Sequence, residues 1–332
     1  MRTSGVCGPA GLALLVLLLL GVDLPACADT LTPGDLLISD GSQHAIYEYT
    51  PDGRRVQTIN IPTPTRYNRG VAVDDAGDIQ VYNGTFTPTL STYNPTSGAW
   101  AHHGFPGWST IGSLYFGGVT AYRDFVYVTD AFTPNGGEPN GIVRFNRGDY
   151  SAQRFANGVD FGYVTLGRDG LLYGLAGKGS PAGMDLYVFD PSTMVLLRTV
   201  GLPVETRGIA VDEAGHIFAP GALMDRNIYE FDENGEILKW LNTHERFMND
   251  IALSGDDQLV VGTANGDDVL LTHTSLSEFG LFHTGGGGNF VTWVPEPVPE
   301  PKSSAMLALS ALGLLAYMGG RKEAGHSVVR SP

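Results

Sequence analysis

Cysteine is almost absent from this chain of 332 residues, and its placement excludes several kinds of chemistry. The only two cysteines, Cys7 and Cys27, both lie within the first 28 residues. The rest of the chain therefore has no disulfide, no thiolate nucleophile and no cysteine-ligated metal. The sequence also lacks the Gly-x-Ser-x-Gly turn of serine hydrolases, the His-Glu-x-x-His zinc motif and a phosphate-binding loop. No motif therefore assigns a catalytic residue.

Positive charge is also scarce. The chain has 20 Lys and Arg against 35 Asp and Glu, and residues 29–301 hold 15 of these cations and 33 of the anions, a net charge of −18. A body this acidic repels nucleic acid and anionic lipid, so we expect no nucleic-acid partner. What is abundant is glycine (45) and proline (20), a composition that favours a turn-rich all-β fold.

A secretory signal is predicted at residues 1–28. Arg2 supplies the positive start, residues 11–21 form the apolar core, and Ala26-Cys27-Ala28 fits a small-x-small cleavage site. Cleavage would then follow Ala28. An alternative interpretation takes Leu24-Pro25-Ala26-Cys27 as a lipoprotein motif with the lipid on Cys27.

The C-terminal region carries a Pro-Glu-Pro motif, an apolar run and a basic pair in that order. The motif is Pro295-Glu296-Pro297, the apolar run covers residues 305–320, and Arg321 and Lys322 follow. This order resembles the PEP-CTERM sorting signal of Gram-negative bacteria. The resemblance implies that an exosortase, a membrane transpeptidase, recognises the signal and cuts near the motif. The tail after Lys322 is longer than the usual short basic ending of that signal.

A plain membrane anchor is the alternative interpretation of the same region. Residues 303–320 are near the lower limit for spanning a bilayer as a helix, at about 1.5 Å per residue. Arg321 and Lys322 would then hold the end of that helix in the cytoplasm. In both interpretations the protein is exported and anchored in the inner membrane. Processing would release it to the cell surface or the extracellular space. Residues 295–304 are expected to form a stiff spacer and 321–332 a basic tail.

One stretch occurs twice in the body of the chain. Residues 69–79 read Arg-Gly-Val-Ala-Val-Asp-Asp-Ala-Gly-Asp-Ile, and residues 207–217 read Arg-Gly-Ile-Ala-Val-Asp-Glu-Ala-Gly-His-Ile. An apolar run, an acidic turn closed by glycine and a second apolar run predict a β-hairpin. A hairpin that returns at a distance indicates a repeat array.

The hairpins belong to a longer unit of four short strands. Apolar runs that open a unit begin at Gly70, Gly118, Tyr163, Gly208 and Asp250, so the period is 42 to 48 residues. A period of this length with four strands is typical of a propeller blade. The first unit lacks an opening strand, and a surplus run at residues 289–294 would supply it. The sequence thus predicts an all-β fold, a six-bladed β-propeller over residues 29–294, with a signal helix before it and a transmembrane helix after it.

The Gly-Ile-Ala-Val-Asp…Gly-x-Ile pattern of residues 208–217 also resembles the NHL and SMP-30-like six-bladed propellers. The resemblance implies that ligands bind at the face where the inner strands begin. Arg69 and Arg207 precede inner strands three blades apart, so we expect them to face each other across the channel mouth. A pair of guanidinium groups there could hold a carboxylate or phosphate. In the alternative interpretation each arginine is neutralised by a nearby carboxylate such as Glu205 or Asp250.

Other polar residues are expected at the same face. Asn68, Asn249 and Asp250 precede or open inner strands, and the ends of second strands carry Asp40, Asn83, Asp130, Asp225 and Asn265. SMP-30-like enzymes place a carboxylate, an Asn and an Asp around a divalent ion. Asn249 and Asp250 match this pattern loosely, whereas the glutamate expected on the first blade has no counterpart. A divalent cation at Asn249 and Asp250 is the weak metal prediction, and no other cofactor is expected.

Two functions follow from these patterns. The favoured one is a non-enzymatic module that binds extracellular polysaccharide or a surface protein. The alternative is an exported metal-dependent hydrolase, lactonase or lyase of SMP-30 type. The connections at residues 104–117, which include Trp108, and 130–140 are the least constrained by the repeat, and loops on a rigid scaffold often carry binding sites. The acidic turn at residues 74–77 has two interpretations, a calcium loop or plain turn chemistry, and turn chemistry is favoured.

Overall fold

The computed structural model describes residues 30–40, 44–62, 68–84, 88–108, 117–130, 140–177, 183–245, 247–263, 268–284 and 289–296. The chain divides into two units, Met1–Pro295 and Glu296–Pro332, and every described strand belongs to the first. Within these ranges no helix is long and apolar enough to cross a membrane. The predicted signal helix at 1–28 and membrane helix at 305–320 lie outside the described residues.

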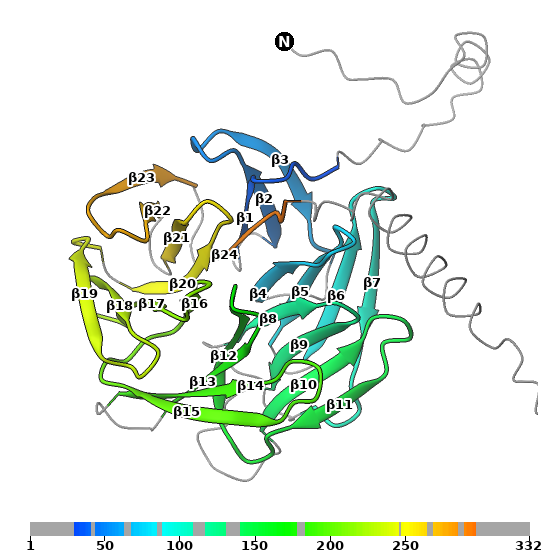
Figure 1. The fold of residues 1–332 in the computed structure, drawn as a ribbon. Helices are drawn as coiled ribbons and strands as arrows, with labels where there is room; N and C mark the ends of the chain where they lie inside the picture. Colours follow the sequence, from blue (N-terminus) through cyan, green and yellow to red (C-terminus); the bar gives the residue numbers. More distant parts are fainter. Residues whose placement is uncertain are drawn as a thin grey trace, which may run out of the picture. The chain divides into compact units, whose positions relative to one another are not determined.

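The described strands form six antiparallel sheets of four strands each, which are the blades of a propeller (Figure 1). The prediction of an all-β, six-bladed propeller is confirmed. Blade 1 contains β24 and β1–β3, blade 2 β4–β7, blade 3 β8–β11, blade 4 β12–β15, blade 5 β16–β19 and blade 6 β20–β23. The bounds are β1 (Leu36–Asp40), β2 (Ala45–Tyr49), β3 (Arg55–Asn60), β4 (Asn68–Val73), β5 (Ile79–Asn83), β6 (Thr89–Asn94), β7 (Ala99–His103), β8 (Val119–Tyr122), β9 (Phe125–Asp130), β10 (Gly141–Asn146), β11 (Ala152–Phe155), β12 (Phe161–Leu166), β13 (Leu172–Gly177), β14 (Met184–Phe189), β15 (Leu196–Leu202), β16 (Ala210–Val211), β17 (Ile217–Pro220), β18 (Asn227–Phe231), β19 (Ile237–Asn242), β20 (Met248–Leu253), β21 (Gln258–Thr263), β22 (Asp268–His273), β23 (Phe279–His283) and β24 (Asn289–Trp293).

The last strand of the chain completes the first blade. β24 pairs antiparallel with β1, from Leu36 opposite Trp293 to Asp40 opposite Asn289. Beyond the strand, the Val294 N–H donates to the Asp35 carbonyl at 2.8 Å. The innermost strands of the six blades also contact one another in a closed ring, in the order β24, β4, β8, β12, β16 and β20. The first and last described strands of the chain are therefore held in one sheet (Figure 1).

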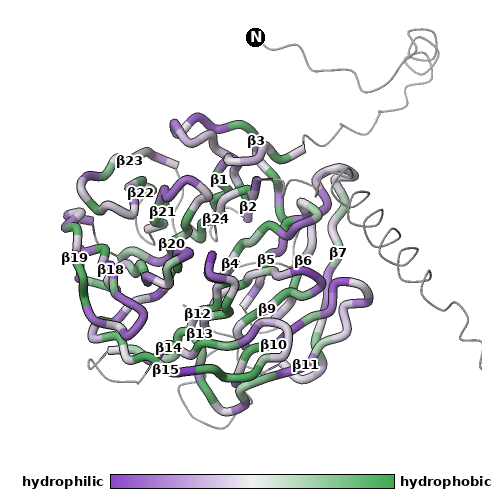
Figure 2. Tube along the Cα trace, viewed as in Figure 1, coloured by the Kyte–Doolittle hydropathy of each residue, from purple (hydrophilic) through white to green (hydrophobic). Residues whose placement is uncertain are grey.

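Apolar side chains on both faces of the strands hold neighbouring blades together. In β1, Leu36 and Ile38 pack with Val260 of blade 6, whereas Leu37 packs with Val71 of blade 2. Successive side chains of a strand point to opposite faces, so a strand buried on both faces reads as a continuous apolar run. Six clusters of this kind fill the six boundaries between blades. Figure 2 shows the hydrophobic stretches along the strands and a hydrophilic start to β4.

Candidate functional site at the propeller mouth

The mouth is the end of the propeller where the innermost strands begin and the second strands end. Asn68 begins β4 and pairs with Asn83, the last residue of β5. Asp40 and Asp130 end the second strands of blades 1 and 3, and both are buried. The up-and-down order of the strands also places the starts of third strands and the ends of fourth strands at the mouth. Asp225 lies just before β18 at this end, and Asn265 is outside the described residues.

Three innermost strands carry a β-bulge at the same place near the mouth. The register shifts between Asn68 and Gly70 in β4, between Phe161 and Tyr163 in β12, and between Met248 and Asp250 in β20. The extra residues are Arg69, Gly162 and Asn249. A bulge redirects the side chains on either side of it and is common next to functional sites.

Tyr163 of blade 4 and Asp250 of blade 6 form a hydrogen bond across the strand of blade 5. The Tyr163 hydroxyl donates to Asp250 Oδ1 at 2.5 Å. The Ile251 N–H donates to the same oxygen at 2.8 Å, and the Val291 N–H of β24 donates to Oδ2 at 2.8 Å. One carboxyl group therefore joins blades 1, 4 and 6. Burial raises the pKa of Asp250 to about 7, although these three donors lower it. Burial and the neighbouring Asp250 raise the pKa of Tyr163.

Glycine makes room for this contact. A Cβ atom on Gly208 would lie 3.0 Å from Asp250 Cα and 3.1 Å from Asp250 Oδ1. A Cβ atom on Gly118 would lie 2.6 Å from the Val164 nitrogen. Because the innermost strands approach so closely, three of the six have only a glycine at this level, and Tyr163 and Asp250 occupy the space. Tyr163 was not predicted as a site residue from the sequence. A signal was present, since Tyr163 stands where Gly70, Gly118 and Gly208 open three other blades.

The predicted metal ligands lie together on β20, at the bulge and immediately after it. Asn249 and Asp250 are both buried. Both carboxylate oxygens of Asp250 accept hydrogen bonds from the protein. Within the described part of the chain, no group of three or more His, Cys, Asp or Glu residues is arranged to hold a metal. A divalent cation at this place stays a prediction.

The two predicted anion-binding arginines lie in blades on opposite sides of the ring. Arg69 is the bulge residue of β4 and packs against Gly117, where a Cβ atom would lie 2.6 Å from Arg69 Cβ. Arg207 precedes β16, and burial lowers its pKa while Glu205 raises it. The charge of Glu205 therefore acts on Arg207, as expected if a nearby carboxylate neutralises that arginine. That the two guanidinium groups meet across the channel stays a prediction.

Buried polar atoms without a hydrogen-bond partner collect at the mouth. Among the described residues they include Ser39 Oγ, His44 Nδ1, both amide atoms of Asn68, Tyr82 Oη, His103 Nε2, Trp108 Nε1, Asn140 Oδ1 and Asp160 Oδ1. Each belongs to a strand end or a connection on the mouth side. Burial also raises the pKa of Asp160 to about 6. Leaving such a group unpaired costs about 1–3 kcal/mol, so a collection of them at one end calls for a functional explanation.

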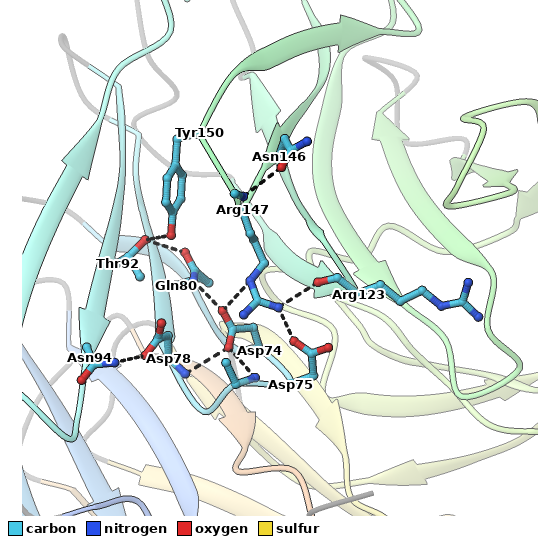
Figure 3. Close-up of polar contacts among 12 residues, drawn as sticks. Asp74, Asp75, Asp78, Gln80, Thr92, Asn94, Arg123, Asn146, Arg147 and Tyr150 are labelled. Carbon is cyan, nitrogen blue, oxygen red and sulfur yellow. Dashed lines mark hydrogen bonds and ion pairs between the residues drawn. The ribbon is translucent and has the colours of Figure 1, made fainter. Parts of the chain in front are cut away.

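At the opposite end of the propeller, acidic turn residues are paired with protein donors, as the turn after β4 shows (Figure 3). Asp74 Oδ1 accepts from the N–H groups of Ala76 and Asp78, both at 3.0 Å, and Oδ2 accepts from Gln80 at 2.9 Å. Arg147 of blade 3 lies 3.1 Å from Asp74 Oδ2 and also pairs with Asp75. Every carboxylate oxygen of Asp74 is thus engaged by protein donors, which supports turn chemistry over a calcium loop.

The second copy of the repeated hairpin is tied down in a similar way. Arg168 of blade 4 donates to Glu213 at 2.8 Å and to Asp257 at 2.7 Å, and so joins the turns of blades 4, 5 and 6. It also donates to the Ser254 carbonyl at 3.0 Å. In the described residues, none of the unpartnered buried atoms lies in these turns. The unpartnered buried atoms named above therefore lie at the mouth and not in these turns.

No family model matches this chain, and no curated protein matches it in sequence. Solved structures do match in fold. The structure of a nidogen/laminin complex aligns at a TM-score of 0.61 with 13% identity, over 78% of this chain and 98% of that one. A Bacteroides caccae protein of unknown function aligns at 0.58 with 13% identity, over 80% and 100%. Virginiamycin B lyase from Staphylococcus aureus aligns at 0.52 with 13% identity, over 77% and 82%. At these identities the likeness shows the fold alone.

Proposed function

We propose that this protein is an exported β-propeller that binds an extracellular polysaccharide or surface protein through its mouth. The observation that carries the proposal is the contrast between the two ends of the ring. At the far end, acidic turn residues such as Asp74 are fully paired. At the mouth, groups such as the Asn68 amide are buried without partners among the described residues. A binding site keeps such groups unpaired at a cost in stability, because the ligand completes their hydrogen bonds.

The proposed cellular location rests on the two ends of the chain. Residues 1–28 direct export, and the Pro-Glu-Pro signal presents the chain to an exosortase. Pro295 and Glu296 are exposed and follow directly on Val294, whose backbone bonds to Gly34 and Asp35 of the propeller, which suits recognition by a processing enzyme. Pro297, Arg321, Lys322, Ala26 and Ala28 lie outside the described residues. The mature protein is then released from the inner membrane to the cell surface or extracellular matrix.

A cosedimentation assay with extracellular matrix from the source organism tests the binding role. Asp160 lies at the mouth, is partly exposed, and has a carboxylate oxygen without a partner among the described residues. Asp160→Lys should abolish saturable binding. The matched control is Asp52→Lys, the same charge change on an exposed turn at the far end. Equal loss of binding in both variants would show that net charge governs the interaction, and unchanged binding by Asp160→Lys would exclude this part of the mouth.

Mass spectrometry of the mature protein from cells tests the proposed C-terminal processing. Sorting predicts a C-terminus between residues 297 and 301. An intact C-terminus at Pro332 would support the plain membrane anchor instead.

A further inference from the structure

One part of the mouth combines unpartnered polar atoms with aromatic rings, at the boundary between blades 2 and 3. Tyr82, near the end of β5, is completely buried, and Trp108 follows β7. Their ring centroids lie 5.9 Å apart, and Phe105 lies 5.6 Å from Trp108 in an edge-on arrangement. Phe105 and Trp108 are only half-buried, so this aromatic group reaches from the core to the surface.

Two hydrogen-bonding groups here have no partner among the described residues. They are the Tyr82 hydroxyl and the Trp108 indole N–H. A hydroxyl both donates and accepts, whereas an indole N–H only donates. Aromatic side chains buried in a core usually find a partner for these polar atoms. Because two neighbouring rings both lack such a partner, we expect a bound ligand to complete these hydrogen bonds.

A charged pair lies beside them. Arg154 of β11 forms an ion pair with Asp130 at the end of β9, and it also donates to the Gly107 carbonyl. Its guanidinium lies 5.5 Å from the centre of the Phe105 ring. Burial raises the pKa of the Tyr82 hydroxyl and the charge of Asp130 raises it further, whereas the charges of Arg69 and Arg154 lower it. The ion pair is thus close to Tyr82, and its two side chains are already engaged with the protein.

We propose that this boundary, where Tyr82, Phe105 and Trp108 lie beside the Asp130–Arg154 ion pair, binds one unit of a neutral saccharide. The inference rests on the proposed role of the mouth as a binding face. Adjacent hydroxyl groups of a sugar each donate and accept, which matches a phenolic hydroxyl beside an indole N–H. The apolar C–H face of the sugar ring packs on the half-buried aromatic rings, and the Tyr82 hydroxyl and Trp108 N–H bond to its remaining oxygens.

The charge balance favours a neutral sugar over an acidic one. Asp130 already neutralises Arg154, so of the charges that act on Tyr82 only that of Arg69 attracts an anion. The body of the protein is strongly acidic, with a net charge of −18 over residues 29–301, and it repels a polyanion. A neutral polymer approaches without that penalty.

Titration calorimetry of the purified full-length protein with neutral tetrasaccharides tests the proposal. The probes are cellotetraose, maltotetraose and mannotetraose, with tetragalacturonate as the acidic comparison. We expect at least one neutral probe to bind and tetragalacturonate to bind more weakly. Binding of tetragalacturonate alone, or of none of the four, would overturn the proposal. The matrix-binding assay with Asp160→Lys is independent of these probes. If it succeeds while all four sugars fail, the mouth still binds, and its ligand is another one.

Tyr82→Phe gives a sharper reading, because binding and stability should move in opposite directions. The variant loses one ligand hydrogen bond, so affinity for the neutral probe should fall about tenfold. It also removes a buried hydroxyl that has no partner among the described residues, so the Tm of the free protein should rise by roughly 2–4 °C. The matched control is Tyr150→Phe, whose hydroxyl bonds to Thr92 Oγ1 at 3.0 Å. This control should leave the affinity unchanged and should not raise the Tm. A lower Tm for Tyr82→Phe with unchanged affinity would show a purely structural hydroxyl.

Tryptophan fluorescence keeps the test valid if Tyr82→Phe does not fold. The chain has four tryptophans, and Trp108→Phe removes the one at this boundary. A neutral probe should change the fluorescence of the unmodified protein in a saturable way, and this change should vanish in Trp108→Phe. A ligand-induced change that persists in Trp108→Phe would place the sugar elsewhere.

Discussion

Replacing Asp250 with asparagine should change how the stability of the propeller depends on pH. Asp250 is buried in the innermost ring, and its pKa is about 7 against an ordinary 3.8. The folded state therefore favours the protonated carboxyl. The stability from this group is fully present below the ordinary pKa and is lost as the pH rises through about 7. A difference of about 3 pKa units corresponds to at most about 4 kcal/mol.

The difference in the free energy of unfolding between the unmodified protein and Asp250→Asn isolates the pH-dependent contribution of Asp250. Asp35 and Asp160, whose pKa values are raised to about 6, contribute the same pH dependence to both. The Asp250→Asn variant loses the acceptor for the Val291 N–H, but that loss is the same at every pH. Urea unfolding followed by circular dichroism at pH 4, 5.5, 7 and 8 should show the unmodified protein losing up to about 4 kcal/mol relative to Asp250→Asn. Parallel curves for the two proteins would refute the assignment of a raised pKa to Asp250.

Two further changes test the packing of the ring. Gly208→Ala places a methyl group about 3 Å from the Asp250 backbone. In urea unfolding, it should lower the free energy of unfolding by about 1–3 kcal/mol. The control Gly201→Ala, whose Cβ would meet nothing within 4 Å, should lower it by less than half as much. Arg168→Met removes the links to Glu213 and Asp257 and should cost about 1 kcal/mol at low salt and less in 1 M NaCl, since partly exposed ion pairs are screened. A loss for Arg168→Met that is independent of salt would show that its apolar stem matters more than its charge.

The blade pattern was predictable because its signals are local in the sequence. A run such as residues 208–211, an acidic turn closed by Gly215, and a return strand lie within a dozen residues. Turn chemistry and strand alternation fix each hairpin, and the constant spacing fixes the array. The same local chemistry predicted that Asp74 serves its own turn, where Asp74 accepts from the Ala76 N–H.

The contacts that define the site were not predictable in this way, because they join distant segments. Tyr163 and Asp250 are 87 residues apart, and their hydrogen bond depends on how closely the innermost strands approach. Arg147 reaches Asp75 from 72 residues away. The missing partners of Asn68 and Tyr82 among the described residues are a property of burial, which periodicity indicates only coarsely. The sequence did point to residue types at the mouth, and Asn68 and Trp108 were among those singled out.

Hydrogen–deuterium exchange in the presence of extracellular matrix material most directly tests whether the mouth is the binding face. Peptides that cover residues 80–84, 104–108 and 157–163 should exchange more slowly when the ligand is bound. Peptides that cover the far-end turns at residues 74–78 and 212–216 should exchange at the same rate with and without it. Protection of those turns, or of the exposed outer strands β15 and β19, without protection of the mouth would contradict the account.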